Sequence, residues 1–323
     1  MAILIFKDKY KIDNLNEGIQ LSEAIDTIAY TATIQLTITD ELDKIGIDKG
    51  DAIEILETNF ETKELESVFK GIIWEKDTDR RIRKAGRIIC KERTVYLEES
   101  EDEYLFPAGQ PATQRAKKLC SDWGIPIGSF ENTIIPLSKA VYRSESIYGI
   151  MLKDLQETAQ KGGELYIYQM KGNLDLIKVG SNKKVWDISN IIEEVNQKSS
   201  LDGTVTQVKV LGKEEKDIKT PVIGIYKKDA DKYGTVQKII QDEKIKSAAD
   251  AKSRANNMFS PGTGSITTTG IDINSIRAGD KVKLNGFEIF VSEVTHKLGN
   301  PGRMSLTLEN YDQIRRRFYN GNI

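Results

Sequence analysis

The sequence predicts a mainly β fold, in which two similar small antiparallel β-barrel domains flank and pack with a middle α/β domain. Three observations lead to this prediction. Ile, Val and Leu alternate with polar residues near both ends of the chain, which is typical of half-buried strands. One short Gly-Asp frame occurs twice, and the apolar spacing between its copies becomes helical. We place the first barrel at residues 1–105, the middle domain at 106–200 and the second barrel, with one Ala-rich helix, at 201–323.

The repeated frame is an apolar residue, two variable residues, Gly-Asp, and then an apolar residue at every second position. Its copies are IDKGDAIEI at residues 47–55 and IRAGDKVKL at residues 276–284. Because Gly reaches backbone angles closed to other residues, the two Gly-Asp pairs are predicted to form turns that set the geometry of each barrel. These turn residues are Gly50, Asp51, Gly279 and Asp280. A doubled module is typical of a building part of a ring rather than of an enzyme with one site.

The first region contains closely spaced strands, which are typical of a barrel or a sandwich. The expected strands are Thr33–Thr39, Ala52–Glu57, Glu66–Trp74 and Gly86–Glu92, and the segment that matches the second copy is Phe69–Glu75. Turn clusters are expected at Asp43–Gly50 and Lys76–Arg80. The second frame is followed by the matching strands Phe290–His296 and Gly302–Glu309.

The middle region begins after the breaker 107–111 with two amphipathic helices. The first spans Ala112–Trp123, with apolar residues at spacings of four, three and four on one face. The second spans Ser146–Gln160, with Ser144 or Ser146 as its N-cap. A hairpin follows, in which Lys171–Asn173 joins the strands Glu164–Met170 and Leu174–Val179.

The third region is again rich in strands and carries one helix. The strands are Val205–Leu211, Val222–Tyr226 and Ile266–Thr269, ahead of the second copy of the frame. The helix spans Ser247–Met258, and its small residues at spacings of three and four predict close packing against a sheet.

Composition narrows the class of protein. The 323 residues include 47 basic and 49 acidic side chains, which gives a net charge of −2. This near-balance argues against a nucleic-acid binder, because such proteins normally have an excess of basic residues. Cys90 and Cys120 both lie in apolar segments and are predicted to be buried free thiols. The apolar start, residues 1–7, is too short for a signal peptide, and no segment approaches the ~20 apolar residues of a membrane span. We expect synthesis in a reducing cytoplasm.

Four features of the sequence are candidates for chemistry, and each favours a structural role. His296 is the only histidine, so a Ser-His-Asp triad depends on it; we predict a hydrogen bond near the end of the strand 287–294. The acidic run Glu98–Glu103 lacks the spacing of a calcium loop and is predicted to be solvated. Ser260–Ser265 follows a helix and opens a strand, which is the reverse of a phosphate loop. Gln313–Phe318 is a basic segment, for which a solvated end is favoured over contact with nucleic acid or an acidic partner.

The sequence therefore predicts no catalytic, cofactor-binding or metal-binding residue. Two alternatives stay open at this point. One is a peptidoglycan hydrolase that uses a pair of carboxylates in a cleft. The other is a carbohydrate-binding protein that stacks sugars on Trp74, Trp123 and Trp186, although Trp74 and Trp123 lie on apolar faces that favour core packing.

Taken in chain order, these features resemble the phage tail hub proteins of the XkdQ/YqbQ and late-control-protein-D type, which occur in contractile tails and phage-tail-like bacteriocins. The resemblance covers nearly the whole chain, and the order of many weak motifs carries it. Arg93 stands where the family pattern has an acidic residue. The matching segments are Gly50-Asp51, Phe69–Ile73, Cys90–Leu97, Cys120–Ile125, Tyr148–Thr158, Ile276–Asp280, Val291–His296 and Met304–Leu306.

This resemblance implies a structural, non-enzymatic baseplate protein. Hubs of this type form homotrimers, and two barrels per subunit make a ring of six near-equivalent modules. Such a ring is a symmetry adaptor that joins a hexameric tail tube or tube-initiator protein to a trimeric spike. The implied partners are these and other baseplate proteins, with no nucleic-acid specificity, membrane insertion or cofactor, and the implied final location is the baseplate of a phage tail or tail-like particle.

Overall fold

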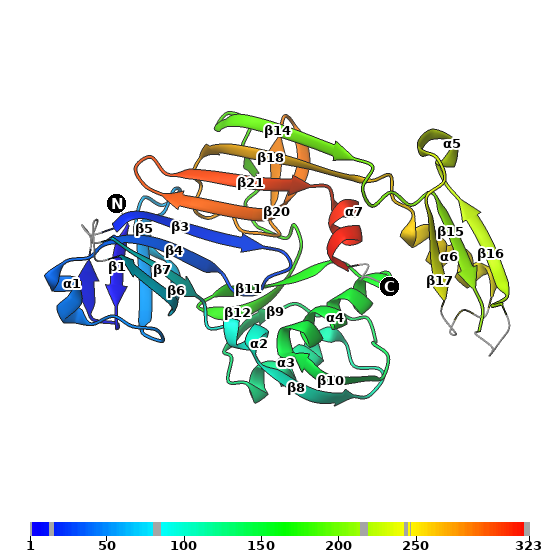
Figure 1. Ribbon diagram of the computed structural model, residues 1–323, viewed down its shortest axis with the longest axis horizontal. Helices are drawn as coiled ribbons and strands as arrows, with labels where there is room; N and C mark the ends of the chain where they lie inside the picture. Colours follow the sequence, from blue (N-terminus) through cyan, green and yellow to red (C-terminus); the bar gives the residue numbers. More distant parts are fainter. Residues whose placement is uncertain are drawn as a thin grey trace.

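More of the described chain lies in strands than in helices, and one sheet runs through both ends of the sequence (Figure 1). The computed structural model describes residues 2–12, 16–79, 85–213, 219–241, 245 and 247–319. Within these residues, 13 strands form the large sheet, whose main path is β14-β18-β21-β20-β3-β4-β7-β6-β5-β1-β2. Its strands are β1 Ile3–Phe6, β2 Tyr10–Ile12, β3 Asn16–Ala24, β4 Thr31–Thr37, β5 Ala52–Thr58, β6 Leu65–Asp79, β7 Ala85–Lys91, β13 Trp186–Asp187, β14 Ile192–Ser200, β18 Thr263–Ile271, β19 Lys281–Leu284, β20 Phe287–Leu298 and β21 Arg303–Glu309.

The large sheet contains two copies of one five-strand arrangement. In the first copy the order is β3-β4-β7-β6-β5, and in the second it is β14-β18-β21-β20-β19. Every neighbouring pair in both copies is antiparallel. Strand β20 of the second copy also pairs with β3 of the first, which joins the copies into one sheet. The predicted repeat is therefore confirmed as a structural repeat.

Alternation explains why these segments are strands. In β4 the residues Ala32, Ile34 and Leu36 are buried, and the residues between them are more exposed, because successive side chains point to opposite faces of a sheet. Helix α1, Asp40–Ile45, follows β4 and occupies part of the predicted turn cluster. It is capped by the Thr39 side chain and ends at Gly46 in the left-handed conformation.

The predicted turn at Lys76–Arg80 is wrong over the residues that the structure describes. Lys76 pairs with Ile88 and Asp77 pairs with Arg87, so strand β6 continues to Asp79. Arg80 itself lies outside the described residues. The segment lacks apolar alternation, but pairing with β7 satisfies its backbone along one edge, and this pairing is invisible in the local sequence.

The middle region has the two predicted helices and the predicted hairpin. Helix α3 is Ala112–Asp122 and helix α4 is Ile147–Gln160, with the Ser146 side chain as N-cap 3.0 Å from the amide of Gly149. The other elements are α2 Val95–Glu99, β8 Glu101–Phe106, β9 Ile127–Phe130, β10 Ala140–Ser146, β11 Tyr166–Lys171 and β12 Asn173–Lys178. Strands β8 and β10 pair with each other, and β11, β12 and β9 form a small sheet.

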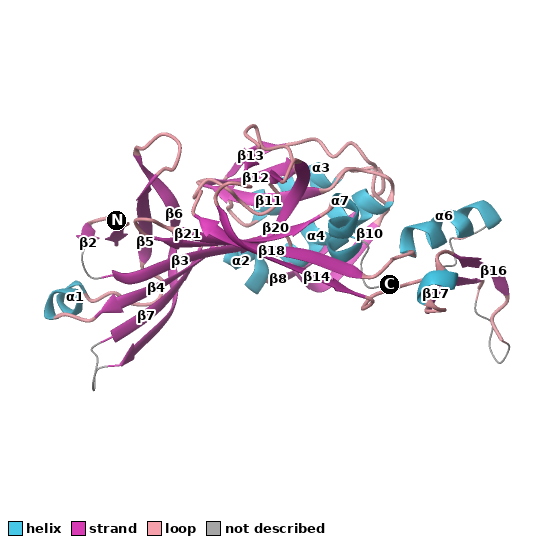
Figure 2. Cartoon of the chain, turned by 90° about the horizontal axis from the view of Figure 1, so that it is seen from above, coloured by secondary structure: helices cyan, strands magenta, loops and turns pink. Residues whose placement is uncertain are grey.

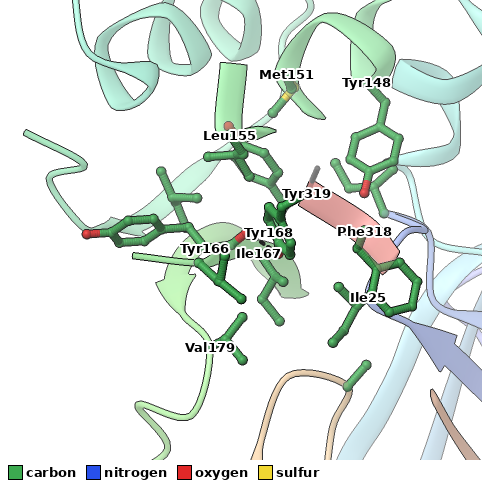
Figure 3. Close-up of a cluster of buried hydrophobic side chains, with 14 of the residues drawn as sticks. Ile25, Tyr148, Met151, Leu155, Tyr166, Ile167, Tyr168, Val179, Phe318 and Tyr319 are labelled. Atoms are coloured by element: carbon green, nitrogen blue, oxygen red, sulfur yellow. Dashed lines mark hydrogen bonds between the residues drawn. The ribbon is translucent and has the colours of Figure 1, made fainter. Parts of the chain in front are cut away.

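A shared core holds the middle region to the second copy and to the end of the chain (Figure 3). Helix α4 contributes Tyr148, Met151 and Leu155, which lie against Tyr166–Tyr168 of β11 and against Phe318 and Tyr319. The Tyr319 hydroxyl donates to the carbonyl of Tyr166 at 2.7 Å. Phe318 and Tyr319 belong to a π-helical turn, η1 Arg315–Tyr319, which follows helix α7, Tyr311–Ile314.

A separate lobe is inserted between β14 and β18 and projects from one end of the molecule (Figure 2). Its sheet has the order β16-β15-β17, and its small core lies under helix α6, as the Ala spacing predicts. Ala251 and Ala255 of α6 are fully buried with Val208 and Val210 of β15. The elements are β15 Gln207–Leu211, β16 Val222–Lys227, α5 Ala230–Tyr233, β17 Gln237–Gln241 and α6 Ala248–Met258.

The predicted division into three domains and the closure of each copy into a barrel stay predictions. The large sheet is continuous from β14 to β2, and β14 at residues 192–200 lies beside β18 of the second copy. Separate cores lie under the first copy, under the lobe, and under the second copy together with the middle region. The mainly β class with an α+β middle region is as predicted.

Candidate assembly interface

The two Gly-Asp turns have the same hydrogen bonds. In the first, the Asp51 amide donates to the carbonyl of Asp48 at 3.2 Å, and the Asp51 carboxylate accepts from the Asp48 amide at 2.7 Å. In the second, the Asp280 amide donates to Arg277 at 3.2 Å, and its carboxylate accepts from the Arg277 amide at 2.8 Å. Burial raises the pKa of Asp280 to about 6. Gly50 and Gly279 are the third residues of their four-residue turns, and both have a φ of 86°. A positive φ at this position favours glycine, because other residues are strained there.

Each turn is attached to the equivalent strand of its copy. The Gly50 amide donates to the carbonyl of Ile73 in β6, and the Gly279 amide donates to the carbonyl of Val291 in β20, at 2.8 and 2.7 Å. One residue after each of these positions the strand has a β-bulge, with the register shifting between Ile73 and Glu75 and between Val291 and Glu293. The repeat is thus reproduced down to single backbone hydrogen bonds, and bulges kept in this way are structural features.

A buried ion pair lies where the second turn meets the first copy. Arg277 donates from Nε and one terminal nitrogen to the two carboxylate oxygens of Glu23 on β3, at 2.8 and 2.7 Å. The Ala278 amide also donates to Glu23, at 3.0 Å, and the guanidinium lies 4.2 Å from the centre of the Tyr30 ring. Both charged side chains are buried. The fork shape of arginine suits this bidentate pairing, which fixes the turn of one copy against a strand of the other.

His296 lies inside β20 rather than after its end, and it is fully buried. Its Nδ1 lies 2.6 Å from Oδ1 of Asp272, and its Nε2 lies 2.8 Å from the carbonyl oxygen of Ile276. Both ring nitrogens thus face oxygen atoms just ahead of the second turn, in the same stretch of chain that carries Arg277. The predicted structural hydrogen bond is present, and the side chain has no exposed surface for a substrate.

Glu92 is a second buried acid close to this joint. Burial raises the pKa of its carboxyl group to about 8, while Arg277 opposes this shift. Its Oε2 atom has no hydrogen-bond partner among the described residues. Because the folded state favours the protonated form, Glu92 binds its proton more tightly in the folded chain than in the unfolded chain.

We expect this carboxyl group to make the protein less stable as the pH rises. Its contribution is fully present below the unfolded pKa of about 4.3 and is lost as the pH rises through the folded value of about 8. Glu92→Gln is expected to flatten the fall in melting temperature between pH 5 and 9, measured by thermal denaturation. Glu99→Gln, at an exposed position, is the control. A fall of the same steepness in wild type and Glu92→Gln would contradict this prediction.

Three other segments named in the sequence analysis lie near helices or strand ends. The acidic run is exposed at 101–103, whereas Glu98 accepts a hydrogen bond from the Ile28 amide at 3.1 Å. The segment 260–265 follows α6 and contains the first three residues of β18, so it opens a strand as predicted. The basic end is not fully solvated, because Arg315 donates to the carbonyls of Ala159 and Gly163.

The tryptophans and cysteines have mainly packing roles. Trp74 and Trp123 pack against buried clusters, as predicted. Trp186 is also partly buried; Phe60 lies edge-on to it, and the ammonium of Lys184 lies 3.7 Å from its ring centre. Both cysteines are buried, and neither forms a disulfide. Burial raises the pKa of each thiol to about 12.

Two buried acids in the described chain have a raised pKa away from the turns, and neither is open to solvent. One is Glu92, and the other is Asp154, whose pKa burial raises to about 6. Asp154 accepts from Arg115 and from the Tyr142 hydroxyl, both at 2.8 Å, and so ties α4 to α3 and β10.

Within the described residues there is no group of three His, Cys, Asp or Glu side chains that could hold a metal ion. Of the helices described, none is long and apolar enough to cross a membrane.

Sequence reasoning missed Glu23, Asp272, Arg277 and Glu92. Arg277 occupies a variable position of the repeated frame, where the first copy has Asp48. That difference was the one signal available, because a long cation replaces a short turn-forming acid. Nothing in the sequence marks Glu23 as its partner, 254 residues away.

This architecture defines a class of protein: a β-rich protein built from a doubled module whose two copies are joined edge to edge. The chain belongs to the YqbQ-like family, whose model matches residues 19–309. Nothing among the curated proteins matches.

Solved structures share this fold at low sequence identity. The 43 kDa tail protein of prophage MuSo2 from Shewanella oneidensis is 12% identical with a TM-score of 0.72, covering 97% of this chain and 99% of that one. A tail protein from Neisseria meningitidis is 13% identical with a TM-score of 0.67, covering 98% and 99%. An E. coli component of the type VI secretion system is 9% identical with a TM-score of 0.55, covering 95% and 76%. The chain therefore has the fold of phage tail proteins.

Proposed function

We propose that this protein is the central hub of a contractile-tail baseplate, and that it forms a homotrimeric ring of six modules between a hexameric tail tube and a trimeric spike. One observation carries the proposal. The chain holds two copies of the same five-strand module, joined through β20 of the second copy and β3 of the first. The YqbQ-like family and the tail-protein fold support the same role.

The joint is of the head-to-tail kind. The fourth strand of one module pairs with the first strand of the next, so the two contacting surfaces differ. Heterologous contacts of this kind generate a ring where the rotation between modules closes. Three chains then supply six near-equivalent modules on one face, while the lobe and the middle region repeat three times. This arrangement suits a six-fold partner on one side and a three-fold partner on the other.

We further propose that the role is not enzymatic. The buried acids described above, Glu92 and Asp154, are enclosed, and Asp154 is held by an arginine and a tyrosine. A general acid in glycoside hydrolysis needs a raised pKa in a cleft that the substrate enters. The enclosed position of these two carboxyl groups favours packing over turnover.

The ring is tested by mass photometry and negative-stain imaging of the purified, concentrated chain. We expect a species of three times the chain mass of 36.3 kDa. Its class averages should show a three-fold ring with six similar modules around an open centre. A chain that stays monomeric at every concentration, or that forms two-fold dimers, would contradict the trimer.

A further inference from the structure

We propose that neighbouring copies of this chain are joined by antiparallel pairing of β14 with the Glu75–Asp79 end of β6, in the register of the joint inside the chain. The inference rests on the hub proposal, because it names the surface through which a ring would close. It identifies the partner of both edges as a second copy of the chain. The joint inside the chain is the template for the joint between chains.

The template is the pairing of β20 with β3. In the chain, Glu293 lies opposite Ala24, and Thr295 lies opposite Ser22. The amide of Ile25 donates to the carbonyl of Ser292 at 3.0 Å, which extends the joint beyond β3. The first part of β20, up to Phe290, pairs with β19 instead, so one edge of β20 serves two partners in turn.

The shared turn and bulge give the equivalent residues of β6. Val291 is equivalent to Ile73, because each accepts the turn glycine amide just before a bulge. Beyond the bulge, Glu293 is therefore equivalent to Glu75, and the next residues follow one by one. The equivalent pairs are Glu293 with Glu75, Val294 with Lys76, Thr295 with Asp77 and His296 with Thr78.

A shared register shift aligns β14 with β3. Both strands show a register shift two residues after their start, between Asn16 and Gly18 in β3 and between Ile192 and Glu194 in β14. Gly18 is thus equivalent to Glu194, and the alignment continues without a gap to the ends of both strands. The equivalent pairs are Ile19 with Val195, Leu21 with Gln197, Ser22 with Lys198, Glu23 with Ser199 and Ala24 with Ser200.

Both edges lack a strand partner within the described residues. Strand β14 pairs with β18 only, and beyond Ile73 strand β6 pairs with β7 only. Strand β14 lies at the outer edge of the large sheet (Figure 1), and residues 193–199 in it are exposed. Such edges present unpaired amides and carbonyls that another strand can bind.

The transferred register places complementary residues opposite each other. Asp77 of one copy faces Lys198 of the next, and both side chains are exposed in the single chain. Opposite charges directly across an antiparallel pair stabilise it, whereas like charges oppose it. In this register Glu75 faces Ser200, Lys76 faces Ser199 and Thr78 faces Gln197, so no like charges meet at these positions.

Two exposed apolar residues support the same surface. Val195 is 53% exposed and Leu201 is 58% exposed. Their counterparts at the internal joint, Ile19 and Ile25, are 2% and 4% exposed. By the template, the Leu201 amide donates to the carbonyl of Trp74 in the neighbouring copy, just as the amide of Ile25 donates to Ser292. Apolar side chains at these two places gain from being covered.

Paired cysteines test the register directly. Residues opposite each other in an antiparallel pair have Cβ atoms about 4.5–5.5 Å apart, close to the distance that a disulfide spans. We expect the Asp77→Cys/Lys198→Cys variant of the full chain to form covalent dimers and trimers under mild oxidation, seen on non-reducing gels. Ser22→Cys/Thr295→Cys tests the chemistry inside one chain and should form an intrachain disulfide. Thr78→Cys/Lys198→Cys is shifted by one residue and should fail, because a one-residue slip turns the side chain to the other face.

The possible outcomes separate this inference from the hub proposal. Covalent trimers from the matched pair alone support the pairing. Trimers in mass photometry with no covalent product, or with equal product from the shifted pair, would overturn the pairing and leave the ring standing. Covalent dimers from Lys198→Cys alone would show that β14 pairs with another β14, which overturns the inference. Monomers without any interchain disulfide would overturn both proposals.

Discussion

Arg277→Ala is expected to lower the free energy of unfolding by about 3–5 kcal/mol, because it leaves the carboxylate of Glu23 buried without its cation. Arg277 is the only bidentate partner of Glu23 within the described chain, and the two groups are 2.7 and 2.8 Å apart at their closest atoms. The substitution also removes the guanidinium from the face of Tyr30. Equilibrium urea denaturation measures the change.

Arg303→Ala is the matched control for this substitution. Arg303 pairs with Glu193, but its side chain is 57% exposed, and exposed pairs contribute about 0–1 kcal/mol. The double variant Arg277→Met/Glu23→Met should recover part of the loss, because apolar side chains of similar volume avoid an unpaired buried charge. Equal losses from Arg277→Ala and Arg303→Ala would contradict the assigned role.

Gly279→Val is expected to destabilise the protein by about 2–5 kcal/mol and to reduce assembly, with no effect on any chemistry. Gly279 has φ of 86°, where a β-branched residue is strained. A Cβ atom there would also lie 2.2 Å from Cδ1 of Ile167 in β11. Thermal denaturation measures the stability, and imaging of the assembled particles measures the ring.

The first copy provides the control, because Gly50 has the same φ of 86° but an added Cβ would meet nothing within 4 Å. Gly50→Val should therefore show the backbone strain alone, about 1–2 kcal/mol. Shortening the neighbour in Gly279→Ala/Ile167→Val should relieve part of the clash that Gly279→Ala alone creates. A correctly assembled ring of normal stability that carries Gly279→Val would count against the role of this turn.

These two substitutions act on one small region. Arg277 and Gly279 belong to the same four-residue turn, and the turn is held to β3 by Glu23 and to β20 by Val291. The joint between the modules thus depends on a buried charge pair and on a glycine that accepts close contact. If the same kind of joint closes the ring between chains, the joint inside the chain is the more strongly held of the two.

The sequence predicted the parts of the fold that depend on neighbours along the chain. Helices α3, α4 and α6 were predicted within one residue of their observed ends, because apolar spacing and caps such as Ser146 act locally. The repeated frame was found for the same reason, since its turn is closed by hydrogen bonds over four residues. The turn expected at Lys76–Arg80 failed because pairing with β7 overrode local preference.

The tertiary structure decided what depends on distant segments. The sequence by itself determined that a Gly-Asp module occurs twice and that a helical region separates the copies. It did not determine that β20 pairs with β3 or that Arg277 meets Glu23 across 254 residues. Nor did it determine that β14 and the end of β6 each have one edge without a strand partner in the described part of the chain. Strand pairing and buried ion pairs form between whichever segments the fold brings together. For that reason the candidate interface could be located only once the order of strands in the sheet was known.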